Sequence, residues 1–270
     1  MRFFFISSSH LEDGIWFRVD DDFKTGMNYV AVSALACGVT VWAFVLMSNH
    51  VHFVVEGDPQ KIEQFILKFK QLYSTYYRRK YGVNELLRRN AFDVREVSTD
   101  NESLEKAVAY VLMNPVAANI CLSASDYPWG SGSCCFSVKR EKGTPAKEMS
   151  FRELRRLIRS EYRVPPQIEI GEDGYILPRS YVPVAWLESL FRTPKRLAFF
   201  LNSSSKARAR LESTPMPSFT DQLLLSGMKE ICVSLFRQRD LNDLTRKETA
   251  LLLTEVKRRF SPDVKQLALT

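Results

Sequence analysis

Hydrophobic residues in the first half of the chain follow two spacings, one typical of strands and the other of helices. β-Prone residues fill 3–6 and a longer tract over 39–55, which is interrupted at Ser48 and Asn49. These runs predict a first strand, followed by two consecutive strands that are joined by a tight turn. A further strand is predicted near 91–97.

Apolar residues at helical spacing occupy the intervals between these strands. They predict helices over 22–37, 59–81 and 102–113. Asp58 followed by Pro59 is a capping signal for the second of these helices, and Asn114-Pro115 predicts the end of the third. The order β-α-β-β-α-β-α favours an α+β fold, in which helices pack against an antiparallel sheet.

A polar segment at 139–150 separates this pattern from the rest of the chain. The segment is short of core-forming residues and predicts a domain boundary, with one domain over 1–138 and a mainly helical region over 151–270. A hairpin is expected near 168–183. An amphipathic helix over 244–260, followed by Ser261 and Pro262, is compatible with the start of a helix-turn-helix, so both DNA binding and a helical scaffold or dimerisation role stay open.

Charge, hydrophobic run length and cysteine content each bear on the class of protein. The net charge of +7 and the pI near 9.1 suit a polyanionic partner, although a basic protein without one is equally compatible. The apolar runs are far shorter than the roughly 18–20 residues that span a bilayer, so no membrane segment is expected. Five cysteines without a CxxC pair indicate a reducing compartment, and we expect a cytoplasmic protein.

Two of the three histidines, His50 and His52, stand one residue apart in a predicted strand. Residues two apart in a strand point to the same face, so both imidazoles are expected side by side and able to hold one divalent metal ion. Only His10 remains as a further imidazole, and oxygen ligands must therefore complete the site. This donor set suits Mg²⁺ or Mn²⁺ better than structural zinc and disfavours a multi-histidine metallohydrolase. The alternative is a pair of hydrogen-bonded histidines beside the core.

One tyrosine differs from the other nine in its place on a predicted helix. Tyr73 and Tyr76 fall within the apolar stripe of helix 59–81 and are expected to pack in the core. Tyr110 lies roughly 130° from the centre of the stripe on helix 102–113, so we expect it to project away from the core. Asn114 follows one turn later on the same side. A phenolic nucleophile beside an oxygen ligand is one interpretation, and a partly exposed tyrosine with Asn114 as a C-cap is the other.

Four stretches of the sequence together resemble the IS200-like single-tyrosine transposases, in the branch associated with repetitive extragenic palindromes. They are "LMSNHVHFVV", "FKQLYSTYYRRKYG", "AVAYVLMNPVAANI" and "DYPWGS", and the resemblance covers about residues 1–137. It implies a ferredoxin-like antiparallel sheet that carries the His-hydrophobic-His (HUH) motif. The family usually has proline where this chain has Ser48, a change expected to loosen the turn before the histidines.

The resemblance also implies residue roles and a reaction. His50, His52 and Asn114 would hold Mg²⁺ or Mn²⁺, and Tyr110 would attack single-stranded hairpin DNA to give a 5′-phosphotyrosine and a free 3′-hydroxyl. A homodimer in which Tyr110 serves the partner's histidines is one family arrangement. The rival hypothesis is a domesticated protein that binds hairpin DNA without useful cleavage.

Basic residues of the predicted helix 59–81 and of the segment after it are candidate DNA contacts. For any single one of them, a solvated helix face is the alternative. The candidates are Lys68, Lys70, Arg78, Arg79, Arg88 and Arg89.

The polar segment at 139–150 gives a first testable prediction. If residues 1–138 fold alone, limited proteolysis should cut the chain between about 139 and 150 and leave a stable amino-terminal fragment, because linkers are cleaved before packed elements. Mass spectrometry of the fragments checks the cleavage sites. Cuts within 40–115 while the linker stays intact would show that this division is wrong.

Overall fold

The computed structural model describes residues 2–8, 15–83, 92–100, 102–118, 120–137, 141–211, 221–237 and 241–260. For residues 203–211, 221–226, 242 and 258–260 it describes the backbone alone. His10, Arg88 and Arg89 lie outside the described residues.

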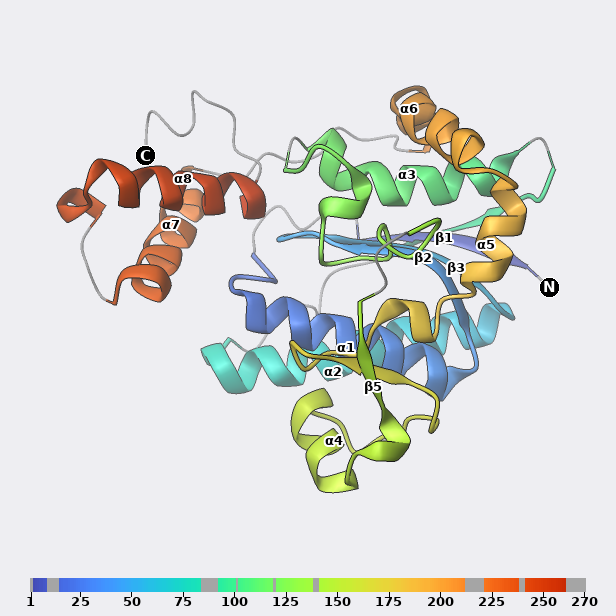
Figure 1. The fold of residues 1–270 in the computed structure, drawn as a ribbon, viewed down its shortest axis with the longest axis horizontal. Coiled ribbons are helices and arrows are strands. Elements are labelled where there is room, and N and C mark those ends of the chain that lie inside the picture. The colour runs from blue at the N-terminus through green and yellow to red at the C-terminus, as the bar shows by residue number, and fades with distance from the viewer. Residues whose placement is uncertain are drawn as a thin grey trace.

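An antiparallel sheet of four strands forms the centre of the molecule (Figure 1). Its strands are β1 (Phe3–Ser7), β2 (Thr40–Leu46), β3 (Val51–Glu56) and β4 (Asp93–Val97), in the spatial order β2-β3-β1-β4. All neighbouring strands pair antiparallel. The α+β class predicted from the sequence is confirmed, and the first seven elements follow the predicted order.

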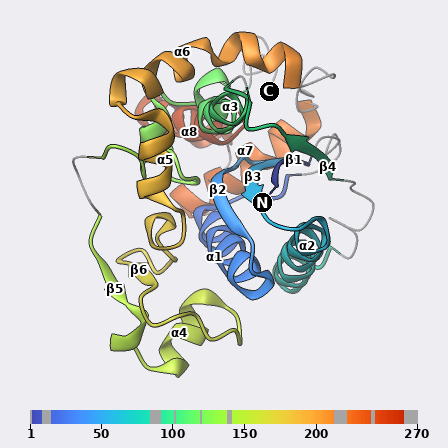
Figure 2. The same ribbon diagram turned by 90° about the vertical axis from the view of Figure 1, so that its right-hand side faces the viewer.

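Helices cover both faces of this sheet (Figure 2). On one face lie α1 (Asp20–Cys37) and α2 (Pro59–Tyr81), while α3 (Ser103–Ala117) lies on the other and is itself covered by α6 (Pro194–Leu211). The alternation of strand side chains separates the two faces. The ring of Phe53 packs against α2, whereas that of Phe5 packs against Tyr110 of α3.

The third helix ends later than its sequence predicts. It continues through Pro115 to Ala117, so the expected end at Asn114 is wrong. Pro115 falls in the last turn, where the missing N–H removes a single helical hydrogen bond and leaves the following turn intact. The backbone N–H of Ala118 still donates to the carbonyl of Asn114. Asn114 is therefore a helical residue and not the C-cap.

The "DYPWGS" stretch covers the outer edge of β2. The Leu46 N–H donates to the Trp129 carbonyl at 2.8 Å, and the Tyr127 hydroxyl donates to the Leu46 carbonyl at 2.7 Å. Gly130 bridges to Val45, and a Cβ at this position would lie 2.7 Å from the Phe44 carbonyl oxygen. Only glycine permits so close an approach, which satisfies backbone groups that an edge strand would otherwise expose.

The remaining elements belong to the second half of the chain. Strands β5 (Gly143–Pro145) and β6 (Glu169–Gly171) pair antiparallel, so part of the predicted linker is a strand. The expected hairpin at 168–183 is present over part of that range: the Gly171 N–H donates to the Tyr175 carbonyl and the Leu177 N–H to the Glu169 carbonyl, around an antiparallel bridge between Ile170 and Ile176, and β6 also pairs with β5. The helices are α4 (Phe151–Ile158), α5 (Val184–Phe191), α7 (Asp221–Phe236) and α8 (Arg246–Phe260), with short 3-10 turns at 124–126, 146–148, 178–180 and 241–243.

The main hydrophobic core crosses the predicted domain boundary. Leu187, Phe191 and Phe200 of α5 and α6 belong to the same buried cluster as the sheet and the inner face of α3. The division into 1–138 and 151–270 stays a prediction, but a fragment that ends at 138 would lack the layer that covers α3.

A buried carboxylate fixes α1 to α2. Asp22 is fully buried and accepts hydrogen bonds from the backbone of Arg18 and Val19 at the start of α1. It also accepts from Tyr76, Tyr81 and Lys80 of α2 at 2.6–2.8 Å. These donors compensate the desolvation of the charge, and each would lose its partner if the carboxylate were removed.

We therefore expect Asp22→Ala to lower the free energy of unfolding by about 3 kcal/mol, because it leaves buried donors without an acceptor. Chemical denaturation followed by circular dichroism measures this loss. Asp58→Ala is the matched control, since Asp58 precedes α2 but makes no capping hydrogen bond through its side chain, and it should change stability by less than about 0.5 kcal/mol. Equal effects of the two variants would contradict the role of Asp22.

Candidate metal and nucleophile site

His50 directly precedes β3 and His52 is the second residue of that strand, on the face of the sheet that α3 covers. His52 pairs with Ser7 of β1 and Val45 of β2 and is 3% exposed. The ring of His50 lies 4.9 Å from that of His52 between centroids. The placement of both imidazoles on one face, predicted from their spacing, is confirmed.

Asn114 projects from α3 toward the same point. Its Oδ1 lies 3.2 Å from His50 Nε2, and the residue is 4% exposed. On its other side, the His50 ring contacts its neighbour in the sequence, with Nδ1 2.7 Å from Asn49 Oδ1. The last turn of α3 and the β2–β3 turn thus enclose one imidazole between two side-chain amides.

Tyr110 lies one turn before Asn114 and also faces the sheet. Its ring is 5.6 Å from that of His52 and 5.5 Å from that of Phe5, both in edge-on geometry. It is 3% exposed, so the expectation that it projects away from the core is wrong. The apolar stripe misleads because α3 is covered on two sides, by the sheet and by α6, so residues outside a single stripe are buried as well.

The donor set at this point fits a divalent cation of the Mg²⁺ or Mn²⁺ kind. Two imidazoles and an amide oxygen converge, and adjacent ligands of an octahedral ion at 2.0–2.1 Å lie about 3 Å apart, close to the 3.2 Å between His50 Nε2 and Asn114 Oδ1. Among the described residues, no three histidine, cysteine or acidic side chains gather around a common point. A cation held here would have neutral protein ligands and would keep most of its charge for a bound anion.

The basic candidates on α2 lie apart from this site. Lys68, Lys70, Arg78 and Arg79 all belong to the helix on the opposite face of the sheet from α3 (Figure 2). Lys70 lies 5.7 Å from the centre of the Phe92 ring, and burial lowers its pKa. A polyanion bound at the histidines would have to pass around the sheet to reach these residues.

The hydroxyls of Tyr73, Tyr76 and Tyr77 on α2 are engaged elsewhere. Tyr73 donates to the Trp16 carbonyl, Tyr77 to the Ile15 carbonyl, and Tyr76 to Asp22. Burial raises the pKa of all three phenols, that of Tyr77 to about 12. The expectation that Tyr73 and Tyr76 pack in the core is confirmed.

Residues 15–18, which no pattern in the sequence singles out, connect this site to the C-terminal helices. The backbone N–H groups of Trp16 and Phe17 both donate to the Ser48 carbonyl, two residues before His50. Arg18 forms an ion pair with Glu230 of α7, and Ile15 packs in the apolar cluster between α7 and α8. Residues 15–18 therefore contact both the histidine turn and the α7–α8 pair.

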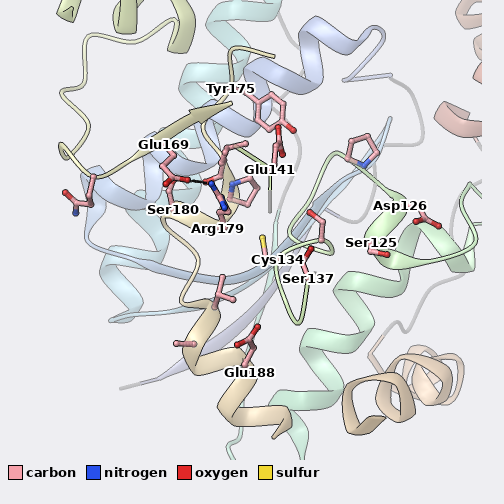
Figure 3. A pocket seen from close by; sticks show the side chains of 17 residues that line it. Ser125, Asp126, Cys134, Ser137, Glu141, Glu169, Tyr175, Arg179, Ser180 and Glu188 are labelled. Carbon is pink, nitrogen blue, oxygen red and sulfur yellow. Dashed lines mark hydrogen bonds and ion pairs between the residues drawn. The ribbon is translucent and has the colours of Figure 1, made fainter. Parts of the chain in front are cut away.

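A pocket of about 930 Å³ lies elsewhere, among the 125–137 segment, β6 and α5 (Figure 3). Four acidic residues line the pocket: Asp126, Glu141, Glu169 and Glu188. Arg179 also lines it and forms an ion pair with Glu169. Burial raises the pKa of Cys134 in its wall to about 12, which keeps that thiol protonated near neutral pH. An acidic pocket of this kind is unsuited to a nucleic-acid phosphate.

Comparison with known proteins places the histidines and Tyr110 in a recognised segment. Residues 19–112 match the family described as "Transposase IS200 like". Over these residues the chain resembles the IS200-like transposases. This IS200-like segment is about a third of the chain, and it ends two residues before Asn114. The resemblance indicated by the motifs is thereby confirmed.

Similarity to a solved structure is distant. A solved structure described as "Structure of the REP associates tyrosine transposase bound to a REP hairpin" aligns with 48% of this chain and 75% of its own, at 14% identity and a TM-score of 0.36. No curated protein matches the sequence. Within the described residues, no helix has the length and apolar character required to cross a membrane.

The converging donors predict that Mn²⁺ binds only while both imidazoles are present. Calorimetric titration should show binding to the wild-type protein and none to the His50→Ala/His52→Ala variant. Asn114→Ala should weaken binding by about tenfold or more, since loss of even an outer-shell partner typically has that effect. Asn28→Ala serves as the matched control, because Asn28 is a buried amide far from the histidines in the fold. Equal binding by wild type and the double variant would exclude the site.

Proposed function

We propose that this protein is a metal-dependent single-tyrosine transposase or nickase that cleaves and rejoins single-stranded hairpin DNA. The observation that carries the proposal is the gathering of His50, His52, Tyr110 and Asn114 at one end of β3 and α3. The IS200-like segment supports a DNA-binding transposase in general. The cleavage chemistry is inferred from the residue types at the site.

Tyr110 is the proposed nucleophile. Its oxygen would attack the phosphorus of a DNA phosphodiester in line, forming a phosphotyrosine bond as the bond to the 3′-oxygen breaks. The phenolic proton passes to solvent, and the departing 3′-oxygen gains a proton to become a hydroxyl. Because the covalent link preserves the energy of the phosphodiester, a later 3′-hydroxyl can reverse the step without ATP.

His50, His52 and Asn114 would hold the cation beside this phosphate. When bound, Mg²⁺ or Mn²⁺ would polarise the scissile phosphate and offset the charge that develops in the transition state. Since the three protein ligands are neutral, phosphate oxygens would supply the anionic ligands. Metal and DNA are therefore expected to strengthen each other's binding.

The burial of Tyr110 places one requirement on this mechanism. At 3% exposure the phenol has little contact with solvent, so DNA must gain access through a movement at the end of α3. Tyr110 lies beside His52 of its own chain, an arrangement that lets a single chain supply both nucleophile and metal ligands. In a homodimer with exchanged helices the same residues would meet between chains.

Tyr110→Phe gives the direct test of the nucleophile. The substitution keeps the ring and its contacts with Phe5 and His52 but removes the oxygen, so folding and hairpin binding should persist while covalent adducts disappear. A labelled single-stranded hairpin is incubated with protein and Mn²⁺, and adducts are detected on a denaturing gel and assigned by peptide mapping.

Tyr77→Phe is the matched control. It removes a buried hydroxyl that donates to the Ile15 carbonyl, so it should cost about 1 kcal/mol of stability yet leave the adduct in place. An adduct that persists in Tyr110→Phe would refute the assignment. If the wild-type protein binds a broad set of hairpins but forms no adduct with any, it is a binding protein and not a nuclease.

A further inference from the structure

The turn between β2 and β3 is held from outside through one carbonyl group. The N–H groups of Trp16 and Phe17, both fully buried residues, donate to the Ser48 carbonyl at 2.8 and 3.0 Å. Within the turn, the Met47 N–H donates to the His50 carbonyl at 2.8 Å. A displacement of Trp16 and Phe17 would therefore reach His50 through consecutive hydrogen-bonded links.

Helix α2 holds the opposite edge of the same backbone. The Ile15 carbonyl accepts from the Tyr77 hydroxyl at 2.8 Å, and the Trp16 carbonyl accepts from the Tyr73 hydroxyl at 2.7 Å. These bonds use the carbonyl groups and leave the Ile15 side chain to pack elsewhere.

The Ile15 side chain packs against α7 and α8. It is 5% exposed and belongs to a buried cluster that includes Met228, Ile231, Leu252 and Val256. Among the described residues of this cluster, Ile15 alone comes from outside α7, α8 and the segment between them. The C-terminal helix pair thus buries part of its apolar surface on the first of residues 15–18.

An ion pair connects the last of these residues to α7. Arg18 Nη1 lies 2.5 Å from Glu230 Oε1, and the two side chains are 26% and 33% exposed. The guanidinium also lies 4.7 Å from the centre of the Tyr81 ring. Partial burial reduces the screening of such a pair by solvent and salt. Ile15 and Arg18, which flank the two donors to the turn, are therefore both in contact with the C-terminal helices.

We infer that α7 and α8 position the histidine turn through residues 15–18, with Glu230 as a positioning residue. Docking of these helices restrains both ends of the segment and so keeps its two central N–H groups on the Ser48 carbonyl. A metal site needs its ligands held to within about 0.5 Å, so a looser turn binds the cation more weakly. This inference rests on the proposed function and deepens it, because it makes a region outside the IS200-like segment a support of the metal site.

The alternative is that α2 alone holds residues 15–18. The hydroxyls of Tyr73 and Tyr77 would then keep the segment on the Ser48 carbonyl whether or not α7 is docked. The two arrangements differ in how the turn responds when the ion pair is lost.

Amide hydrogen exchange of the metal-free, full-length protein measures this response. The reporters are the amides of Trp16, Phe17 and Met47, which are hydrogen bonded at the turn. In Glu230→Ala they should exchange about threefold faster or more than in the wild-type protein, since local opening sets the exchange rate. The Val39 amide, hydrogen bonded at the end of α1, should keep its wild-type rate. Nuclear magnetic resonance resolves the individual amides.

Calorimetric titration with Mn²⁺ measures the consequence for the metal site. Glu230→Ala should weaken binding by about threefold or more, a smaller effect than the tenfold or more typical of an outer-shell partner. Glu230→Gln keeps an oxygen that can accept from Arg18 and should retain most of the affinity. Glu161→Ala is the matched control, because it removes a glutamate paired at the same 2.5 Å with Arg155 of α4, away from residues 15–18 (Figure 1). It should change neither the exchange rates nor the affinity.

Wild-type exchange at Trp16, Phe17 and Met47 in Glu230→Ala overturns the inference, because α2 alone would then hold these residues. Faster exchange without weaker Mn²⁺ binding overturns it as well, since the turn would not govern the metal ligands. Failure of the proposed function has a different signature: Glu230→Ala behaves as expected in both measurements, yet no hairpin forms an adduct with Tyr110. In that case the positioning of the turn by α7 and α8 stands.

Discussion

The packing of α3 between the sheet and α6 is the constraint on which the candidate site depends. The histidines belong to the strand layer, whereas Tyr110 and Asn114 belong to the helix above it. Their separation is therefore set by a contact between layers and not by local chain geometry. Because α6 contributes Phe200 to the same core, a region outside the IS200-like segment helps to hold α3 in place. The site is assembled by long-range packing.

This dependence explains how far the sequence could predict the structure. Local signals located most of the elements, since the spacing of apolar residues and the Asp58-Pro59 pair identify α2 to its terminal residues. The His50–His52 pair was predictable for the same reason, as strand alternation is a local property. Tyr110 was placed on the correct helix, yet its burial could not be read from one stripe when the helix has two buried sides. The pairing of β6 with β5 was likewise missed, because it is set by tertiary contact.

The proposed metal ligands are neutral, and two clusters of acidic side chains lie away from them. The carboxylate of Asp22 accepts hydrogen bonds from Tyr76, Tyr81 and Lys80 on the far side of the sheet. The acidic pocket bounded by Glu141 and Glu188 belongs to the 125–137 segment and α5. The carboxylates of these two clusters thus lie away from the imidazoles. Because negative charge repels a polyanion, this arrangement suits the proposed binding of DNA.

The two hydrogen bonds that converge on the Ser48 carbonyl bear on the one departure from the family pattern. The resemblance to the IS200-like transposases implies proline at this position, and serine leaves the backbone a wider choice of conformations. The contacts at position 48 are made by the backbone oxygen, which proline and serine share, and the buried Ser48 hydroxyl has no hydrogen-bond partner among the described residues. A proline ring would stiffen this turn by restricting φ. The hydrogen bonds from Trp16 and Phe17 to the Ser48 carbonyl also stiffen it. With serine at position 48, the turn is held from outside by these hydrogen bonds, so the sequence of residues 15–18 must also stay compatible with the histidine pair.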